Sequence, residues 1–600
     1  MVVKESVYAP PQWIRRGPAP DSHKVNLQIA LKQRAIDTLE QELLDISDPD
    51  SPNYGKWMSQ AQVNSYLKPE RRSVEVVRRW LADNGIQEKV AKRSVAGDWM
   101  NAEMTVAQAR ELLGNADFAI WEHRSTGEQL VRTIEYSLPR SVSDHVDLIG
   151  PTTYFSQIRA LNTMGKRSTT MKWEPVTSNY EDFVGASQKS AVDSVAKMQK
   201  VSASTLAAND VNGVPASCNV SSVSFDCLRQ FYKSYSYKVK NPTKQLIGIS
   251  GFLEEYASFS DLAKFLTTQR PDAAKANYKF NVVLNGDGAV NDQSDPGGEA
   301  NLDVQTVAAV GFNIPSTYYS NAGRPPYIPD QVTPTNTNEP YSTEFEYLLN
   351  LPDSKLPSLL STSYGDDEQT VPIKYQRRVC LEIAALGARG VTVFFSSGDS
   401  GVGADGKCYS NDGKNTYKFL PSFPPSCPYV TAVGATEQFA PEQASGPTAH
   451  YYGGGGFSET WPMPAYQKSA VEPYVKSLGN KYKGLYNPKG RAYPDVSAQG
   501  SRFIVVNNGT FGHASGTSAS CPLTTSIFAL INDKRISAGK PKLGFINPAL
   551  YKGAGLKGLN DITVGSNNGC NTTGFPTSTG WDAATGFGTP NFEKLSAVFT

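Results

Sequence analysis

The chain has 600 residues, room for three or four domains, or for two when one is a large α/β unit. Its 58 basic and 57 acidic side chains give a net charge of +1, so no excess field favours a nucleic acid or an anionic membrane surface. No apolar run approaches the ~20 residues that span a bilayer, and the hydrophobic content is ordinary. Composition therefore argues against nucleic-acid binding and excludes membrane insertion and wholesale disorder.

The front of the chain predicts a small α+β domain over residues 1–160. VNLQIAL, from Val25, predicts a strand, and an amphipathic helix with an apolar stripe follows from Ile36. A second helix is expected at Ser73–Asp83. Residues 161–213 are mostly polar and rich in Ser, Thr, Lys and Ala, which predicts a protease-accessible connector.

Residues 214–600 alternate apolar strands with helices, which predicts a doubly wound, mostly parallel sheet with functional groups just after its strands. The expected strands are KQLIGISGF, YKFNVVLNG, LPSLLSTSYG, VTVFFSSGD and YVTAVGAT, and helices are expected near Phe259–Leu266, from about Pro296, and near Gln376–Leu386.

Seven cysteines lie in this back part, and none has C-x-x-C spacing; with only five scattered histidines, a transition-metal site is improbable. We predict the short-range disulfides Cys218–Cys227 and Cys408–Cys427 and leave Cys380, Cys521 and Cys570 unassigned. Three N-glycosylation acceptors, Asn219, Asn508 and Asn571, fit an extracellular or vacuolar protein. The first 17 residues lack the apolar segment of a signal peptide, so either a signal has been removed or the inference about the compartment is wrong.

Ser518 is a candidate nucleophile. It lies in HASGTSASCP, ahead of the apolar helical run TTSIFALI, where backbone N–H groups and the helix dipole would favour attack on a carbonyl. The alternative is an ordinary capping serine. The usual base would be His450 or His513, but neither has an obvious carboxylate beside it in sequence, and polar structural histidines are the favoured interpretation.

Glu299 and Asp303 are candidate acid–base groups in SDPGGEANLDVQTVAAVGF. Asp295 could cap a helix with Pro296 at its first position, so the two carboxylates would share one face. Like charges one turn apart in a partly buried site raise one pKa, which allows acid–base catalysis in mildly acidic medium. Most such pairs are instead solvated helix faces.

Asp399 directly follows the apolar strand in VTVFFSSGDSG. A protonated carboxyl group there could donate a hydrogen bond to a developing oxyanion, and the alternative is a turn aspartate bonded to its own backbone. Asp561 and Asp582, in Gly-rich turns near the C-terminus, form an oxygen set suited to Ca²⁺, although aspartate is also common turn chemistry.

Together these residues resemble the sedolisins, the serine-carboxyl peptidase family that includes tripeptidyl-peptidase I. The likeness rests on Gly516-Thr517-Ser518 with Pro522, on GGEANLD (297–303), SGDSG (397–401), GGGFS (454–458) and YPDVSA (493–498), and on the later NDI and GWD elements. LKQRAIDTLEQELLDISDPDSPNYGKWMS resembles a sedolisin pro-domain, so the likeness covers nearly the whole chain except the connector. It implies a subtilisin-like fold behind a ferredoxin-like pro-domain.

The resemblance also implies a role for each candidate. Ser518 becomes the nucleophile, Glu299 the general base and acid, Asp303 its orienting carboxylate and Asp399 the oxyanion stabiliser. Gly454, Gly455 and Gly456 would border the substrate subsites before the scissile bond, unless the glycines form only a flexible loop. One structural Ca²⁺ would be held by Asp561, Ile562, Ser578, Gly580 and Asp582. Ser578 stands where some relatives have glycine, which a backbone ligand tolerates.

The expected protein is thus a zymogen and a monomer, with peptide or protein substrates and its own pro-domain as intramolecular inhibitor. Acid would release the pro-domain and permit cleavage within 185–213. The expected activity is secreted, acid-active tripeptide release. The alternatives are a sedolisin-type endopeptidase, a non-catalytic Ca²⁺-dependent binding protein on the same scaffold, and a subtilisin-type protease that uses a histidine near neutral pH.

Overall fold

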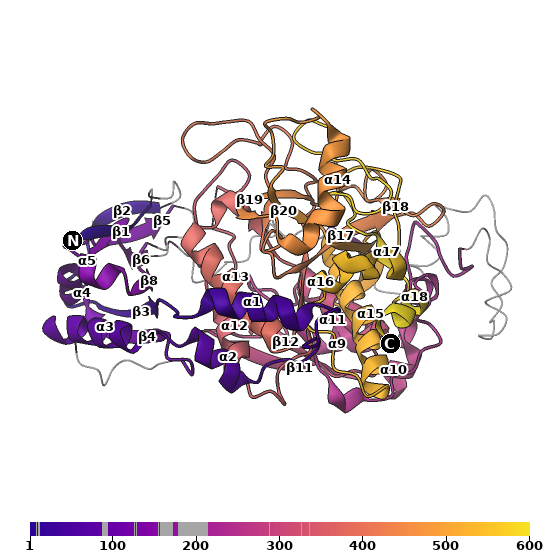
Figure 1. Ribbon diagram of the computed structural model, residues 1–600, viewed down its shortest axis with the longest axis horizontal. Coiled ribbons are helices and arrows are strands. Elements are labelled where there is room, and N and C mark those ends of the chain that lie inside the picture. The colour runs from indigo at the N-terminus through magenta and orange to yellow at the C-terminus, as the bar shows by residue number, and fades with distance from the viewer. Residues whose placement is uncertain are drawn as a thin grey trace.

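A computed structural model describes residues 1–7, 9, 13–86, 94–124, 127, 129–153, 155, 172–177, 214–286, 288–325, 327–334 and 336–600. Figure 1 shows a small body, formed by the front of the chain, beside a larger body formed by the rest. The cleavage window expected at 185–213 lies outside the described residues.

The small body contains short antiparallel sheets covered by helices. β3 (Lys24–Leu31) lies between β4 (Trp99–Thr105) and β8 (Val146–Gly150). The helices of this body include α3 (Arg71–Asp83) and α4 (Val106–Leu112), whose apolar residues join one core with those of β3. The remaining strands are β1 (Val2–Ser6) paired with β7 (Glu135–Leu138), and β2 (Trp13–Pro18), β5 (Ala119–His123) and β6 (Gln129–Arg132) in order. The predicted strand after Val25 and helix at 73–83 are confirmed.

Helix α1 (Ile36–Ser47) joins the two bodies. Figure 1 shows it reaching from the small body across α13 (Ile373–Ala388) of the large one. Leu39 and Leu43 are fully buried in the same apolar cluster as residues of α13. Full burial stabilises by about 1.5–3 kcal/mol for each such side chain, so this contact anchors the front of the chain firmly.

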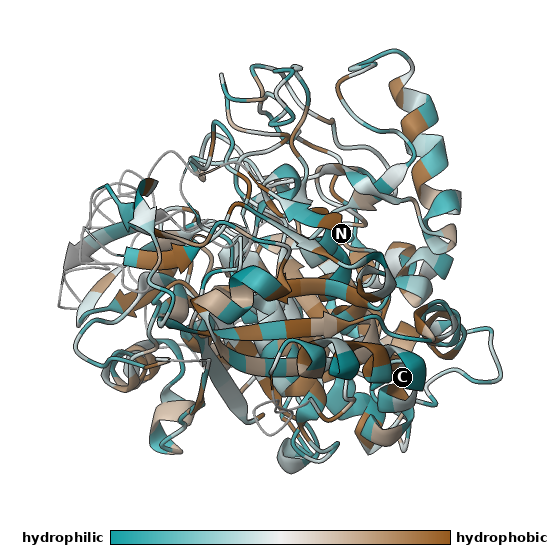
Figure 2. Ribbon diagram, turned by 90° about the vertical axis from the view of Figure 1, so that its left-hand side faces the viewer, coloured by the Kyte–Doolittle hydropathy of each residue, from teal (hydrophilic) through white to brown (hydrophobic). Residues whose placement is uncertain are grey.

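The large body is built on a sheet that is parallel apart from β18 (Gln443–Ala444) and carries helices on both faces. Successive residues of β15 (Thr392–Ser396) show the two faces. Phe394 joins the apolar cluster of α11 (Gly298–Val310) and α15 (Thr517–Ser537), and Phe395 joins that of α12 (Tyr341–Asn350) and α13. Figure 2 shows hydrophobic stretches along these central strands. The doubly wound fold is confirmed. The strand order is β11 (Asn281–Asn285), β12 (Ser316–Asn321), β10 (Ile247–Gly251), β13 (Leu359–Thr362), β15 (Thr392–Ser396), β17 (Thr431–Glu437) and β18 (Gln443–Ala444), with β21 (Val496–Gln499) also beside β17.

Part of the expected connector forms a strand. β9 (Lys172–Thr177) pairs antiparallel with β23 (Thr510–Ser515), which also pairs with β22 (Phe503–Asn507). The polar composition of 161–213 gave no sign of this pairing, because β9 depends on a partner more than 300 residues away.

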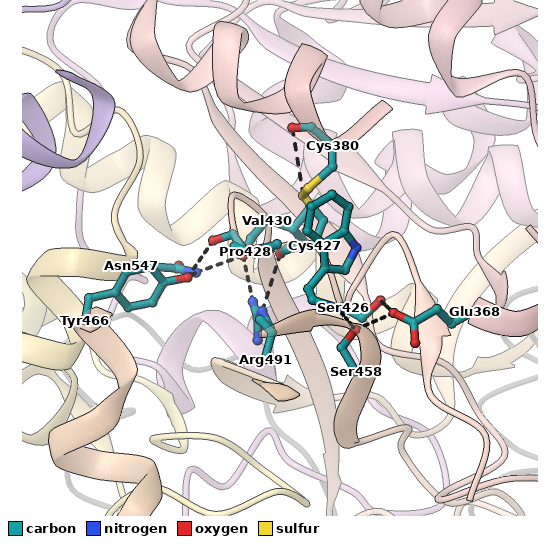
Figure 3. The surroundings of a disulfide bond; sticks show 11 residues. Glu368, Cys380, Ser426, Cys427, Pro428, Val430, Ser458, Tyr466, Arg491 and Asn547 are labelled. Atoms are coloured by element: carbon teal, nitrogen blue, oxygen red, sulfur yellow. Dashed lines mark hydrogen bonds between the residues drawn. A yellow bond between two sulfur atoms is a disulfide. The ribbon is translucent and has the colours of Figure 1, made fainter. Parts of the chain in front are cut away.

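The disulfide predictions are partly wrong. The Cys218–Cys227 disulfide is confirmed. Cys427, however, bonds Cys380 of α13, and their Cα atoms are 5.8 Å apart (Figure 3). Cys408 bonds Cys570, with Cα atoms 5.5 Å apart. Cys521 is a buried free thiol. Short sequence separation was the wrong guide, because Cys380 and Cys427 meet in one apolar cluster while Cys408 lies against the C-terminal loops.

Candidate active site

Ser518 is the second residue of α15, after Gly516 at the N-cap and Thr517. The predicted place in the first turn of a helix is confirmed, and the side chain is fully buried. Its Oγ lies 3.5 Å from the carbonyl oxygen of Ser363, the residue that follows β13. The serine therefore lies at the carboxyl edge of the sheet, where doubly wound folds hold their functional groups.

Glu299 and Asp303 lie one turn apart on α11 and face this serine. They are 1% and 0% exposed, so the alternative of a solvated helix face is wrong. The Ser363 hydroxyl donates a 2.8 Å hydrogen bond to Asp303 Oδ1, and the Ser518 hydroxyl lies close enough to the Glu299 carboxyl to lower its pKa. Nucleophile, candidate base and candidate orienting carboxylate thus form one connected group.

Burial is the main electrostatic influence on the two carboxyls. It raises the pKa of Glu299 well above its ordinary value, and the negative charges of Asp303 and Glu255 raise it further, against a lowering by the nearby Ser518 hydroxyl. Burial also raises the pKa of Asp303, against the hydrogen bond from Ser363. Two such neighbours hold a shared proton well above the pH at which free carboxyls lose theirs.

The start of α11 differs from the prediction. The helix begins at Gly298, with Gly297 at the N-cap and no side-chain cap, so the expected roles of Asp295 and Pro296 are wrong. Glu255 Oε2 instead accepts the Glu299 amide at 3.1 Å. A carboxylate from another segment therefore replaces the local cap.

Asp399 follows β15 and contacts the residue before the nucleophile. Its Oδ1 accepts hydrogen bonds from the Thr517 amide at 2.8 Å and the Thr517 hydroxyl at 2.7 Å. The Gly398 amide in turn donates to that hydroxyl at 3.2 Å. These bonds hold Asp399 beside the N-terminus of α15, a contact that a turn aspartate bonded to its own backbone would not make.

The two histidines of the back part have other surroundings. Nε2 of His513 lies 3.0 Å from the Ser222 hydroxyl, and burial lowers the pKa of this histidine to about 4. His450 is exposed, with a left-handed backbone at φ +62°. The acid–base side chain beside Ser518 is Glu299, whose pKa the serine hydroxyl lowers.

The glycine run packs tightly against the strand that leads to Asp399. Gly454 donates its amide to Gly398 O at 2.5 Å, and a Cβ at Gly454 would lie 2.1 Å from the Ser397 carbonyl. Gly454, Gly455 and Gly456 are buried, so they are not a loose surface loop. Ser458, just beyond them, donates to the buried Glu368 (Figure 3). A role in substrate binding stays a prediction.

The expected calcium residues also lie together. Asp561 Oδ2 accepts the Gly580 amide at 2.9 Å, and Asp582 Oδ2 accepts the Ser578 amide at 2.9 Å, so both carboxylates contact loop 578–582. Asp582 is fully buried, and Ile562 is 2% exposed. Within the described residues no group of three or more His, Cys, Asp or Glu side chains could hold a metal ion. Both Asp582 oxygens accept backbone amides here, Oδ2 from Ser578 and Oδ1 from Ala584 and Thr585, so calcium binding by this oxygen-rich set stays a prediction.

The three sequons lie at the surface to different degrees. Asn508 and Asn571 are exposed, and Asn219 is partly exposed. Among the described helices, none has the length and apolar character needed to cross a membrane.

Two residues of the site were not singled out from the sequence, Glu255 and Ser363. Each closely follows a strand of the sheet, β10 and β13 respectively, as Asp399 follows β15. The strand-end rule that selected Asp399 could have selected both, although nothing local distinguishes them from ordinary loop residues.

The fold and this cluster define a class, a subtilase-like serine peptidase preceded by an activation domain. Residues 11–155 match the Pro-kumamolisin activation domain, and residues 334–559 match the subtilase family. The chain is 37% identical to the probable tripeptidyl-peptidase SED3 of Arthroderma benhamiae, over 100% of this chain and 95% of that protein. It is 36% identical to the tripeptidyl-peptidase SED2 of Arthroderma otae, over 100% and 96%.

A solved structure of Pseudomonas sedolisin, a serine-carboxyl proteinase, matches 63% of this chain and 97% of its own at 20% identity and a TM-score of 0.45. The full-length relatives decide the family: the chain belongs to the sedolisins, the serine-carboxyl peptidases, and carries their pro-domain.

Proposed function

We propose that this chain is the zymogen of a secreted, acid-active peptidase that releases tripeptides from free N-termini through an acyl-enzyme. The observation that carries the proposal is the buried contact of Ser518 with the Glu299–Asp303 pair. The names of the full-length relatives support tripeptide release.

In the first step Ser518 Oγ attacks the scissile carbonyl while Glu299 takes its proton. Asp303 keeps the proton that the pair shares and orients Glu299. Asp399, held by Thr517, would act in its protonated form, which donates a hydrogen bond to the oxyanion. Glu299 then protonates the leaving amine, and water, activated by the same carboxylate, hydrolyses the ester on Ser518.

Acid activity follows from the shared proton. As pH rises, the buried pair loses this proton, Asp303 becomes a second buried anion, and the rate falls. Because burial raises the pKa of both groups, the loss comes well above pH 4. A histidine base would give the opposite trend, with activity lost as acid protonates the imidazole.

A free N-terminus is a requirement of exopeptidases, and a sedolisin-type endopeptidase remains the second candidate because the catalytic group is common to both. The non-catalytic binding protein is disfavoured, since it gives no reason to bury Glu299 and Asp303 beside Ser518 and Ser363.

The pro-domain would act as an intramolecular inhibitor until acid loosens it. Its docking through α1 and a buried ion pair between Asp98 and Arg378 of α13 support this role. Cleavage within 185–213 would then separate the pro-domain from the catalytic part.

A single Ca²⁺ held by the side chains of Asp561 and Asp582 and by carbonyls of residues 562, 578 and 580 would brace the C-terminal loops without taking part in the reaction. The disulfides, and glycans at Asn219, Asn508 and Asn571, fit secretion.

The test is a pH–rate profile of acid-activated protein on an unblocked peptide and its N-acetylated twin, with Ser518→Ala as control. Activity below about pH 6 that requires Ser518 and is lost on acetylation supports a tripeptidyl-peptidase. Equal rates on both peptides indicate an endopeptidase. Activity only near neutral pH, or activity that survives Ser518→Ala, overturns the mechanism.

A further inference from the structure

Glu255 is a buried carboxylate beside the catalytic pair that the proposed chemistry does not use. It lies shortly after β10 and is 3% exposed. Its Oε2 accepts the backbone amide of Glu299 at 3.1 Å, so it reaches the first turn of the helix that carries both catalytic carboxyls.

Two contacts fasten that first turn to the segment 255–256. Glu255 accepts the Glu299 amide, and the Gly297 amide donates to Tyr256 O at 2.9 Å. The approach is so close that a Cβ at Gly297 would lie 2.0 Å from Glu255 Oε2. The backbone position of Glu299 therefore depends on Glu255.

The ionisable groups that sense the charge of Glu255 come from three elements. They are Glu299 and Asp303 on α11, Tyr318 on β12, and Tyr364 after β13, and the negative charge of Glu255 raises the pKa of each. The Tyr318 hydroxyl also donates to the Glu255 carbonyl at 2.7 Å. Asp399 also lies near Glu299 and, when ionised, raises the pKa of Glu299 as well. All are acids, so an anion at Glu255 favours their protonated forms.

We propose that Glu255 is a positioning residue for the catalytic pair: its carboxylate holds the backbone of Glu299 in place, and its charge keeps the shared proton on Glu299 and Asp303 up to higher pH. The proposal rests on the proposed function, because it concerns the same pair of carboxyls.

Two substitutions separate these roles. Glu255→Gln keeps an acceptor oxygen for the Glu299 amide and removes the charge, so the alkaline limb of kcat/KM should move down by about one pH unit with kcat at the acid plateau little changed. Glu255→Asp keeps the charge and shortens the side chain, so kcat at the plateau should fall by about 10–100-fold with the limb unmoved.

The neighbouring Glu254 supplies a matched control. It pairs with Arg324, whose Nη1 lies 3.0 Å from Glu254 Oε1. Glu254→Gln makes the same chemical change one residue away and should leave the profile as in the parent enzyme.

All proteins are compared after acid activation, with thermal melts to establish folding and active sites counted with a serine-reactive probe. The proposal is overturned if the Glu255→Gln limb superimposes on the parent or moves upward, or if Glu254→Gln shifts it equally. If the parent enzyme is active in acid and requires Ser518, but the alkaline limb of Glu255→Gln does not move, this proposal alone is wrong. A parent without such activity defeats the proposed function and this inference together.

Discussion

Asp98 and Arg378 form an ion pair in which the two side chains are 4% and 3% exposed. Asp98 belongs to the small body, just before β4, and Arg378 to α13 of the large body. Arg378 Nε also donates to Glu382 at 2.9 Å, and Gln33 donates to Asp98 at 2.8 Å. The boundary between pro-domain and catalytic part thus contains a buried, charged contact besides its apolar one.

This contact predicts a pH threshold for activation. Burial disfavours the charge of Asp98, but Arg378 and hydrogen bonds from Ser94 and Gln33 hold the pKa of Asp98 below its ordinary value. Its stabilisation is present above about pH 4 and is lost as pH falls through the depressed pKa. The pKa of Glu382 is shifted in the opposite direction: burial raises it to about 7, so Glu382 takes up a proton at higher pH than Asp98 does. Burial also raises the pKa of Glu346, the third carboxyl beside Arg378, so Asp98 is the carboxyl that keeps its charge to the lowest pH.

Asp98→Asn should therefore let the zymogen mature at higher pH than the parent, because removing one partner of a buried ion pair costs about 3–5 kcal/mol. Gel analysis and N-terminal sequencing across pH measure the threshold. Asp117→Asn is the matched control, since Asp117 pairs with Arg15 at the exposed surface of the small body. If Asp98→Asn matures at the same pH as the parent, the ion pair has no role in setting the pH of activation.

Glu299→Gln should reduce kcat by a factor of about 10⁴ or more, comparable to Ser518→Ala, because the serine loses its proton acceptor. The double variant should be scarcely slower than either single variant, as expected when residues act as one unit. The rates are measured in single-turnover experiments on variants whose pro-domain has been removed by the active parent enzyme. Additive losses would show that Glu299 and Ser518 act independently.

Asp399→Ala should lower kcat by about 10²–10³-fold with KM little changed, because it removes a donor to the oxyanion, which exists only in the transition state and the intermediate. The control is Thr517→Ser, which keeps both hydrogen bonds to Asp399 Oδ1. A loss confined to KM would place Asp399 in ground-state binding instead.

Peptide mapping without reduction should recover the links Cys380–Cys427 and Cys408–Cys570, and the unfolded chain should expose one thiol, that of Cys521. Cys570→Ser should lower the free energy of unfolding by about 2–5 kcal/mol. Recovery of a Cys408–Cys427 peptide from freshly folded protein would contradict this arrangement.

Ca²⁺ should raise the Tm of the parent protein, and at 100 times its Kd it adds about 2.7 kcal/mol of stability. Asp561→Asn should weaken this response, whereas Mg²⁺ should not reproduce it, because Mg²⁺ demands a stricter octahedral geometry. A Tm that does not respond to Ca²⁺ or to a chelator would remove calcium from the proposal.

Elements with strong local patterns could be predicted from the sequence. The composition of the apolar run before Asp399 predicts a strand, and that of the run after Ser518 predicts a helix. The structure has β15 and α15 at those places. β12 was missed, because STYYSN looks polar although both of its faces are buried in the sheet. Its character as a strand comes from the neighbours β10 and β11.

Where a contact joins distant segments, local rules failed. Asp295 and Pro296 are good helix-start residues, but Glu255 supplies the acceptor and α11 begins later. Similarly, the contact of Ser363 with Asp303 depends on how α11 and α15 pack together on the sheet, which no spacing in the sequence encodes.

The bond between Cys408 and Cys570 closes a covalent ring of the intervening chain, and Ser518 lies inside it. A single nick anywhere in that ring leaves both new ends attached to the same molecule through the sulfur bridge. At high concentration, one copy of a peptidase can cut another. After one such cut within the ring, the segment that carries Ser518 would stay attached, and a fragment would be released only after a second cut.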